Sequence, residues 1–234
     1  MSLASLLKQN NNPELRLDRN SLKDQSTELL RSYIISGRIP PGTKLAEREL
    51  ADLLGVSRMP ARDALMDLER EGLVVSRPNG RYVIELHPKA IDQLFEIRLV
   101  LERLAVSAAA ANHSEQNCAA LRANLEQMAE AITRNDRDAF VRADLEAHQL
   151  IWNQANNPYL LKMLNSIVGP IFMFISSHPD FQTNWRETLQ LHQELADAIC
   201  AGDAAQAVRS IEAQMQESVD LSYRAFAKSQ GKTS

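Results

Sequence analysis

The feature that most constrains this chain is the stretch from Pro88 to the C-terminus, where helical periodicity recurs and almost no strand pattern is present. Apolar residues return every three or four positions, the spacing that places them on one face of an α-helix. The pattern predicts about six helices, near residues 90–112, 115–134, 137–155, 158–177, 184–201 and 203–229. Such helices bury their apolar faces against one another, so we expect an all-α helical bundle.

The N-terminal third begins with two predicted helices of unequal length. Residues 22–36 carry the apolar spacing of an amphipathic helix, and the Pro-Pro-Gly turn at residues 40–42 cannot continue it. Residues 47–54 predict a short second helix. Gly55 follows it, and glycine readily adopts the left-handed conformation that ends many helices.

A third helix and a hairpin complete this region. Ser57 is a favourable N-cap for the helix, and Gly72 ends it. Residues 73–84 predict two short strands around the turn sequence Pro78-Asn79-Gly80. Helix, short helix, glycine turn, helix and hairpin within about 65 residues is the order of elements in a winged helix-turn-helix.

The chain is therefore predicted to be mainly α, with a small β wing. Residues 1–20 are polar and predict a mobile arm, residues 21–87 the winged helix-turn-helix, and residues 88–234 the all-α helical bundle. The net charge is −4, but residues 1–88 carry 13 basic and 12 acidic side chains, so the acidity lies in the C-terminal part. The charge neither supports nor excludes binding of double-stranded DNA by the N-terminal domain.

Membrane and redox signals are weak. No apolar run approaches the roughly 18 residues that a membrane span requires, and the N-terminus lacks the pattern of a signal peptide. Cys118 and Cys200 lie far apart in the sequence and match no metal-binding or disulfide framework. We therefore expect reduced core thiols in a cytoplasmic protein that does not contact a membrane.

The third helix carries a candidate DNA-reading face. At about 100° per residue, its apolar stripe consists of Ala61, Ala64, Leu65 and Leu68. Arg58 and Arg62 lie one turn apart on the outward side, near the N-terminal end of the helix. Recognition helices present that end to the major groove, and arginine bonds bidentately to guanine.

Further basic residues are placed to contact phosphates. These are Arg48 on the second helix and Arg77 and Arg81 on the wing. The alternative is a solvated face whose arginines pair with acidic neighbours at helical spacing, namely Asp63, Glu69 and Glu71.

Two segments of this region resemble the GntR family of bacterial regulators. They are Gly37-Arg-Ile-Pro-Pro-Gly-Thr-Lys-Leu and Glu47-Arg-Glu-Leu-Ala-Asp-Leu-Leu-Gly-Val-Ser-Arg-Met-Pro-Ala-Arg-Asp-Ala-Leu, within a similarity that covers residues 22–84. The resemblance implies DNA contacts at family positions occupied by Arg48, Ser57, Arg58, Arg62 and the wing-tip Gly80. Ala46 departs from the family, which often has a serine capping the second helix there.

The helical part places polar residues inside apolar stripes. Asp144 and His148 lie one turn apart among Phe140, Val141 and Ile151, and burying a carboxylate without partners costs several kcal/mol. The other inward polar residues lie on three further helices: Arg98, Glu102, His192 and Gln214. One carboxylate and two imidazoles suit zinc, nickel or manganese. A hydrogen-bonded core network without metal is the alternative.

Residues 90–223 resemble the helical ligand-binding domain of the FadR-type subfamily, called FCD. The similarity lies in Glu96-Ile-Arg-Leu-Val-Leu-Glu, Asp144-Leu-Glu-Ala-His, Asn157-Pro and Leu191-His-Gln-Glu-Leu-Ala-Asp-Ala-Ile. It implies a metal held by one aspartate and three histidines, of which Asp144, His148 and His192 match three. Gln214 stands where the family has its fourth ligand, which puts the affinity or identity of the metal in doubt.

The resemblance also implies a small organic-acid effector whose carboxylate pairs with an arginine, best matched by Arg98 and less well by Arg186. The apolar run from Ile171 to Ile175 predicts either a pocket wall or bundle core. We expect a homodimeric regulator that binds an inverted-repeat operator. Two alternatives remain: a DNA binder with a vestigial pocket, and a metal-dependent enzyme, for which Glu102 is the only inward candidate base.

Overall fold

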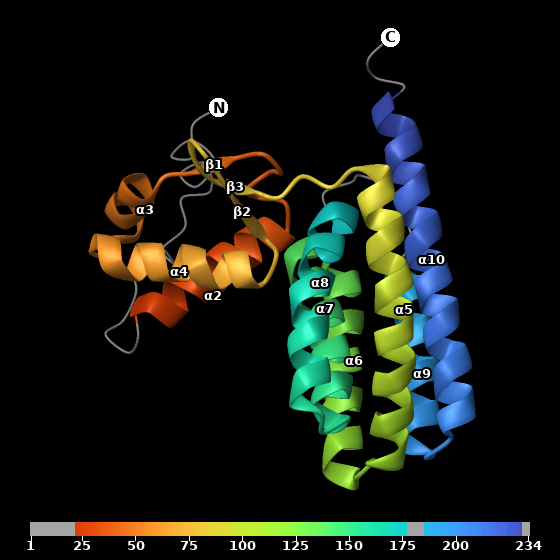
Figure 1. Ribbon diagram of the computed structural model, residues 1–234. Helices are drawn as coiled ribbons and strands as arrows, with labels where there is room; N and C mark the ends of the chain where they lie inside the picture. The colour runs from red at the N-terminus through yellow and green to blue at the C-terminus, as the bar shows by residue number, and fades with distance from the viewer. Residues whose placement is uncertain (1–21, 177–184, 231–234) are drawn as a thin grey trace. The chain divides into compact units, whose positions relative to one another are not determined.

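The computed structural model describes residues 22–176 and 185–230 of the chain (Figure 1). They divide into two compact units, one ending at Leu86 and the next beginning at His87. Among the described residues, the first unit holds three helices and a small sheet, and the second holds helices alone. The predicted class, mainly α with a winged N-terminal domain, is confirmed. The predicted arm at residues 1–20 lies outside the described residues.

The first unit has the predicted order of elements with one addition. In chain order they are α2 (Leu22–Ile35), β1 (Lys44–Leu45), α3 (Glu47–Leu54), α4 (Arg58–Arg70), β2 (Val74–Arg77) and β3 (Gly80–Val83). The strands form an antiparallel sheet in the order β1-β3-β2. The two-residue strand β1 was not predicted, because so short a segment carries no alternating pattern.

The helix ends in this unit follow the expected backbone chemistry. Gly55 adopts φ +66° at the end of α3, the left-handed conformation that side chains other than glycine rarely take. Ser57 occupies the N-cap of α4 with an extended backbone, but its side chain makes no capping hydrogen bond. The hydroxyl of Ser57 is exposed instead. The apolar stripe of α4 is fully buried against the rest of the unit.

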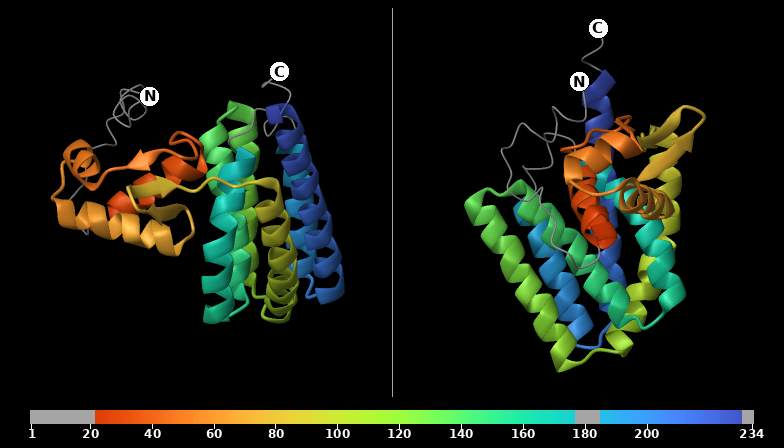
Figure 2. Two further views of the ribbon diagram at one scale, coloured as in Figure 1. Left: turned by 45° about the horizontal axis from the view of Figure 1, so that its top comes forward. Right: turned by 90° about the vertical axis from the view of Figure 1, so that its left-hand side faces the viewer.

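The second unit is a bundle of six helices within the described residues (Figures 1 and 2). They are α5 (Pro88–Ala111), α6 (Glu115–Arg134), α7 (Arg137–Gln154), α8 (Pro158–Ser176), α9 (Trp185–Cys200) and α10 (Ala204–Gln230). Helix α5 packs against α7, α8, α9 and α10, while α6 packs against α7 and α9. None of the helices in the described part of the chain combines the length and apolar character that crossing a membrane requires.

The two cysteines overturn the expectation of reduced thiols. Cys118 in the first turn of α6 and Cys200 at the end of α9 form a disulfide, with their Cα atoms 5.7 Å apart. They are separated by 82 positions in sequence, so no local spacing announces the pair. The packing of α6 against α9 brings them together. The disulfide links two helices of the bundle covalently.

Candidate DNA interface and candidate metal centre

The N-terminal half of α4 presents two arginine side chains. Arg58 and Arg62 are exposed, and neither forms an ion pair within the described residues. Two of the acidic side chains suggested as alternative partners are engaged elsewhere. Glu71 accepts two hydrogen bonds from Arg31, at 2.6 and 2.7 Å, and Glu69 pairs with another arginine. Both arginines of α4 are therefore available to a ligand.

The arginines of the wing differ from this pair. Arg81 is only 18% exposed and bridges Glu47 at 2.6 Å and Glu69 at 3.3 Å. Arg77 is exposed, lies over the ring of Tyr82 and reaches Glu85 at 3.1 Å. The alternative in which arginines of a solvated face pair with acidic side chains thus fits the wing better than it fits α4. A phosphate contact by Arg81 would have to compete with two carboxylates.

Two further cations flank this surface. Arg48 on α3 is exposed and, among the described residues, forms no ion pair. Lys44 was not predicted as a contact, because β1 was not predicted. A Cβ atom at Gly80 would lie 3.2 Å from Cε of Lys44, so Lys44 lies beside the wing tip. Gly80 itself has φ +129°, a conformation that favours glycine.

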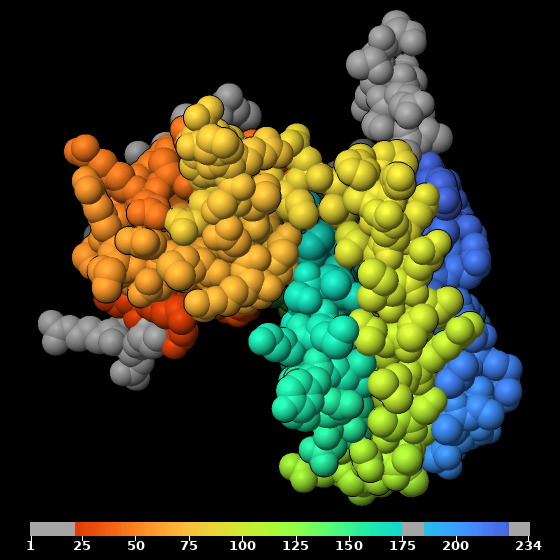
Figure 3. Space-filling view, viewed as in Figure 1, coloured from red at the N-terminus to blue at the C-terminus, as the bar shows by residue number. Residues whose placement is uncertain are grey.

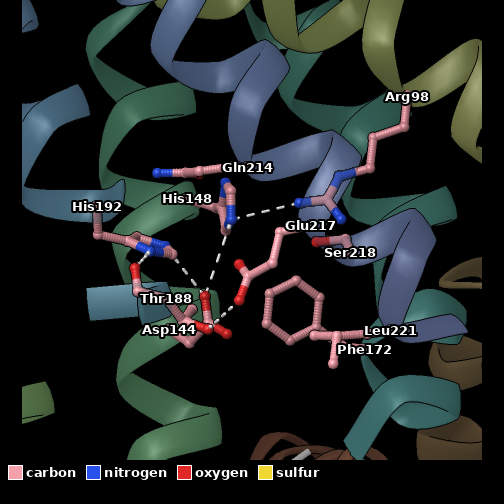
Figure 4. A pocket seen from close by; sticks show the side chains of 10 residues that line it. All are labelled: Arg98, Asp144, His148, Phe172, Thr188, His192, Gln214, Glu217, Ser218 and Leu221. Atoms are coloured by element: carbon pink, nitrogen blue, oxygen red, sulfur yellow. Dashed lines mark hydrogen bonds and ion pairs between the residues drawn. The ribbon is translucent and has the colours of Figure 1, made fainter. Parts of the chain in front are cut away.

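The second unit contains a pocket lined by side chains from five helices, four of which contribute polar groups (Figure 4). Its empty volume is about 460 Å³, including solvent at its mouth. The lining residues are Arg98 from α5, Asp144 and His148 from α7, Phe172 from α8, Thr188 and His192 from α9, and Gln214, Glu217, Ser218 and Leu221 from α10.

Asp144, His148 and His192 form the candidate metal centre. Nε2 of His192 lies 3.1 Å from Oδ1 of Asp144, and Nε2 of His148 lies 3.9 Å from the same oxygen. All three residues are buried, and one ligand atom from each lies within 4.8 Å of the others. Metal bonds of about 2.0–2.2 Å hold ligand atoms roughly 3–3.5 Å apart. Small side-chain movements would therefore close these three donors around an ion.

Both imidazoles are held with Nε2 facing the centre. Nδ1 of His192 lies 2.9 Å from the carbonyl oxygen of Thr188, so it carries the proton and donates. His148 accepts at Nε2 from Nη2 of Arg98, at 3.3 Å, because a guanidinium can only donate. Its Nδ1 lies 3.6 Å from the carboxylate of Glu102, which favours the proton on that nitrogen. Metal-binding histidines characteristically have this tautomer.

The electrostatics separate the two histidines. Burial lowers the pKa of His148 well below its usual value, and the nearby Arg98 and His192 lower it further. His148 is therefore neutral, as a metal ligand must be. Burial also opposes the charged form of His192, but its contact with Asp144 and the charge of that carboxylate raise its pKa overall. In the metal-free protein, Asp144 thus favours a protonated His192.

Arg98 is anchored from behind the pocket. Its Nε donates to Oε1 of Glu102 at 3.1 Å, and Trp152 donates to the other oxygen at 2.8 Å. Glu102 is completely buried, and its two acceptor contacts give it a structural role. The guanidinium lies over the ring of Phe172, with 5.6 Å to the centroid. The sequence pattern indicated the inward Arg98 and Glu102, but not the tryptophan that completes the network.

Gln214 enters the pocket from α10 with only 3% of its surface exposed. Neither its amide oxygen nor its amide nitrogen has a hydrogen-bond partner among the described residues. The predicted residues Arg98, Asp144, His148, His192 and Gln214 are thus brought together. Arg186 is exposed at the start of α9 and does not line the pocket.

Three polar residues of the pocket wall were not predicted from the sequence: Thr188, Glu217 and Ser218. Thr188 donates to Glu217 at 3.1 Å across the interface of α9 and α10. Thr188 lies four residues before His192, and Ser218 four residues after Gln214, so each pair shares a helix face. That spacing was the available signal.

A winged helix-turn-helix joined to a helical domain with a buried polar pocket defines a ligand-responsive class of transcription regulators. Residues 22–84 match the gntR family of bacterial regulatory proteins, and residues 93–217 match the FCD domain. The chain therefore belongs to the GntR family of bacterial regulators and carries an FCD domain. It is a DNA-binding transcription regulator, and membership of this family confirms the expectation that it is not an enzyme.

Individual relatives agree with this assignment. The "Probable D-xylose utilization operon transcriptional repressor" of Paenarthrobacter nicotinovorans is 31% identical over 80% of this chain and 83% of its own length. The "Gluconate operon transcriptional repressor" of Bacillus licheniformis is 33% identical over 70% of this chain and 67% of its own length. Among solved structures, "E. coli McbR/YncC" has a TM-score of 0.77 and 25% identity, covering 88% of this chain and 99% of its own.

Proposed function

We propose that this protein is a homodimeric repressor whose affinity for its operator changes when a small carboxylate-bearing metabolite binds at a divalent metal in the helical domain. The observation that carries the proposal is the buried centre of Asp144, His148 and His192, in which both imidazoles direct Nε2 inwards. Repression is supported by the printed names of two relatives. Since bacterial DNA lies in the cytoplasm, the protein acts there.

The residues of the centre fit a metal ion. Nε2 of His192 is buried without a well-formed hydrogen bond, although it lies 3.1 Å from Asp144. Two nitrogens at 3.1 and 3.9 Å from one carboxylate oxygen leave a gap that a cation would fill. When bound, the ion would supply positive charge and open positions for an oxygen ligand. Asp144, His148 and His192 would hold it, and Thr188 and Glu102 would orient the imidazoles.

The pocket chemistry supports a small acid with hydroxyl groups as the effector. Arg98 provides a fixed guanidinium at one side, and guanidinium pairs well with carboxylates. Thr188, Glu217 and Ser218 provide oxygen-bearing groups on the other helices. Hydroxyl groups both donate to and accept from such side chains. The names of the two relatives refer to a sugar and a sugar acid, which supports this class of effector.

The dimer surface is proposed on α5 and α8, which pack side by side (Figure 3). Five large apolar residues of these helices are exposed: Ile97, Val100, Leu104, Tyr159 and Met163. Those on α5 follow the spacing i, i+3 and i+7, which forms one stripe. A second copy is the proposed occupant, because helix-turn-helix regulators read paired half-sites as dimers. Light scattering should give twice the mass of a 26.2 kDa chain, and Val100→Glu should give the monomer.

One observation favours a second candidate, a regulator with a metal-free pocket. Arg98 donates to His148 at 3.3 Å, and His192 lies 3.1 Å from Asp144, so each imidazole already faces a protein group. A protonated His192 would form a buried ion pair with that carboxylate. In this case the effector carboxylate would bind to Arg98 alone.

Elemental analysis and thermal melting separate these candidates. The chelator-stripped full chain is offered zinc, nickel or manganese, and we expect one ion per chain and a higher melting temperature. His192→Ala should lower metal affinity by roughly 10–100-fold or more, because it removes a ligand. The exposed His113→Ala is the matched control and should bind like the wild type. Absence of metal from the wild type under all three conditions would leave the metal-free candidate.

A test of effector control uses an operator selected from random duplex DNA. The selected sequence should be a short inverted repeat with half-sites about one helical turn apart. Sugar acids and other small carboxylates are then screened by thermal shift on the full chain. An effector should change operator affinity in the wild type but not in Arg98→Ala. Operator affinity that no stabilising compound alters would contradict the regulatory part of the proposal.

A further inference from the structure

The feature of the pocket that its protein contacts explain least is the amide of Gln214. The side chain is 97% buried and lines the same pocket as the three candidate ligands. Figure 4 shows it beside His148 and His192, entering from α10, whereas those ligands come from α7 and α9. A buried amide without hydrogen bonds costs free energy, so its persistence here points to a partner that binds within the pocket.

The remaining side chains of the pocket define which partner is chemically suitable. The three buried ligands are two imidazoles and one carboxylate. Beyond them, the uncharged groups that could approach an ion are oxygens: the amide oxygen of Gln214 and the hydroxyls of Thr188 and Ser218. Among the described residues, those that line the pocket include no cysteine and no third histidine.

Metal ions differ in how well they accept such a donor set. Zinc is bound in a tetrahedral arrangement by nitrogen, sulfur and carboxylate ligands, including sets of two histidines and one glutamate. Two histidines and one carboxylate with open positions are typical of non-haem iron(II), and carboxylate, carbonyl and water oxygens suit manganese(II). The amide oxygen of glutamine is a carbonyl-type donor. A half-turn of the side-chain amide exchanges the places of its oxygen and nitrogen, so Gln214 can turn its oxygen toward an ion.

We infer that Gln214 makes the centre selective for six-coordinate, oxygen-favouring ions of the manganese(II) and iron(II) class, at the expense of zinc. The inference rests on the metal site of the proposed function. Asp144, His148 and His192 supply three donors, and the amide oxygen of Gln214 supplies a fourth, weaker one. Two positions are left for water or for a chelating effector.

The position of Arg98 is consistent with a weakly held ion. Its guanidinium donates to Nε2 of His148 at 3.3 Å, the same lone pair that an ion would use. The ion must therefore displace one donor contact of an arginine that stays anchored to Glu102. A site of moderate affinity, filled or emptied according to the available metal and effector, follows from this competition.

The test compares manganese(II) and zinc(II) binding to the chelator-stripped full chain by competition with a coloured chelator. Gln214→His should raise zinc affinity by roughly 10–100-fold, because it supplies an imidazole, and manganese affinity by a smaller factor. Gln214→Glu supplies a charged oxygen and should raise manganese affinity. The control Gln216→His lies on the exposed side of the same helix and should change neither affinity. Circular dichroism and melting curves show whether each variant is folded.

The possible outcomes distinguish failure of the selectivity inferred for Gln214 from failure of the metal site on which it rests. Equal factors for zinc and manganese in Gln214→His would overturn the selectivity of Gln214 while leaving the metal site intact. No change for either ion in both Gln214 variants would show that position 214 does not reach the ion. Metal binding by neither the wild type nor Gln214→His would overturn the proposed metal site itself, and this inference with it.

Discussion

The two units of this molecule hold unpaired polar groups in opposite surroundings. On α4, Arg58 and Arg62 are exposed and form no ion pair within the described residues, yet water solvates them fully. In the helical pocket, Gln214 is buried with neither amide atom hydrogen-bonded. An unpaired group costs little in water and much in the interior. The lack of a partner therefore indicates that Arg58 and Arg62 are available to DNA, and that the amide of Gln214 is missing a ligand.

Ion pairs also differ in burial between the two units. The ion pairs of the first unit that involve Arg70 and Arg77 are exposed, and exposed pairs contribute about 0–1 kcal/mol. The pair of Arg98 and Glu102 is buried, with side-chain exposures of 1% and 0%. Breaking a buried pair leaves an uncompensated charge in the interior. The predictions below test whether burial decides the size of each effect.

The largest effect is expected for Glu102→Ala. The change leaves the guanidinium of Arg98 buried without its carboxylate and removes the acceptor of the Trp152 indole. We expect the free energy of unfolding to fall by about 3–5 kcal/mol. Urea unfolding followed by circular dichroism measures it. Arg70→Ala, which breaks an exposed pair with Asp67, is the control and should change stability by less than about 1 kcal/mol.

The disulfide is the next test, because it links two helices of the helical unit covalently and Cys118 is buried. Cys118→Ser should lower the free energy of unfolding by about 2–4 kcal/mol under oxidising conditions. With a thiol reductant present, wild type and variant should unfold at similar urea concentrations, since neither then contains the cross-link. A difference that persists unchanged in the reductant would mean that packing of Cys118, rather than the bond, stabilises the protein.

The comparison also explains how much the sequence could predict. Helix periodicity located each helix that the structure describes, because each buries an apolar stripe. The exposed arginines of α4 and the inward Asp144, His148 and His192 follow from the same angular argument. Arg81 could not be placed, since its pairs with Glu47 and Glu69 depend on how the wing packs against α3 and α4. The disulfide and Trp152 likewise depend on contacts between helices remote in sequence.

On the DNA side, Arg58→Ala and Arg62→Ala should each weaken binding to the selected operator by about 1–3 kcal/mol and relax base preference at one position per half-site. Arg70→Ala, at the far end of the same helix and paired with Asp67, should bind normally. Fluorescence anisotropy at fixed salt measures all three. Unchanged affinity in both Arg58→Ala and Arg62→Ala would remove α4 as the recognition helix.

The smallest effect tests the comparison directly, by removing one unpaired group from each unit. Gln214→Met keeps the length of the side chain but removes the amide that lacks partners. In the metal-free protein it should therefore raise the free energy of unfolding by about 1 kcal/mol, since an unsatisfied buried polar group is no longer desolvated. Arg58→Ala removes an equally unpaired but exposed group, and its stability should stay within about 0.5 kcal/mol of the wild type.

Both measurements are made by urea unfolding in the presence of a chelator, so that no ion contributes. A loss of stability in Gln214→Met would mean that the amide already has a partner in the folded protein, such as a bound water. Added manganese should reduce the stability advantage of Gln214→Met over the wild type, or reverse it. The wild type gains stability from an ion that reaches its amide oxygen, whereas Gln214→Met lacks that donor and should gain less. The buried amide of Gln214 would then require a ligand, whereas the equally unpaired but exposed Arg58 would not.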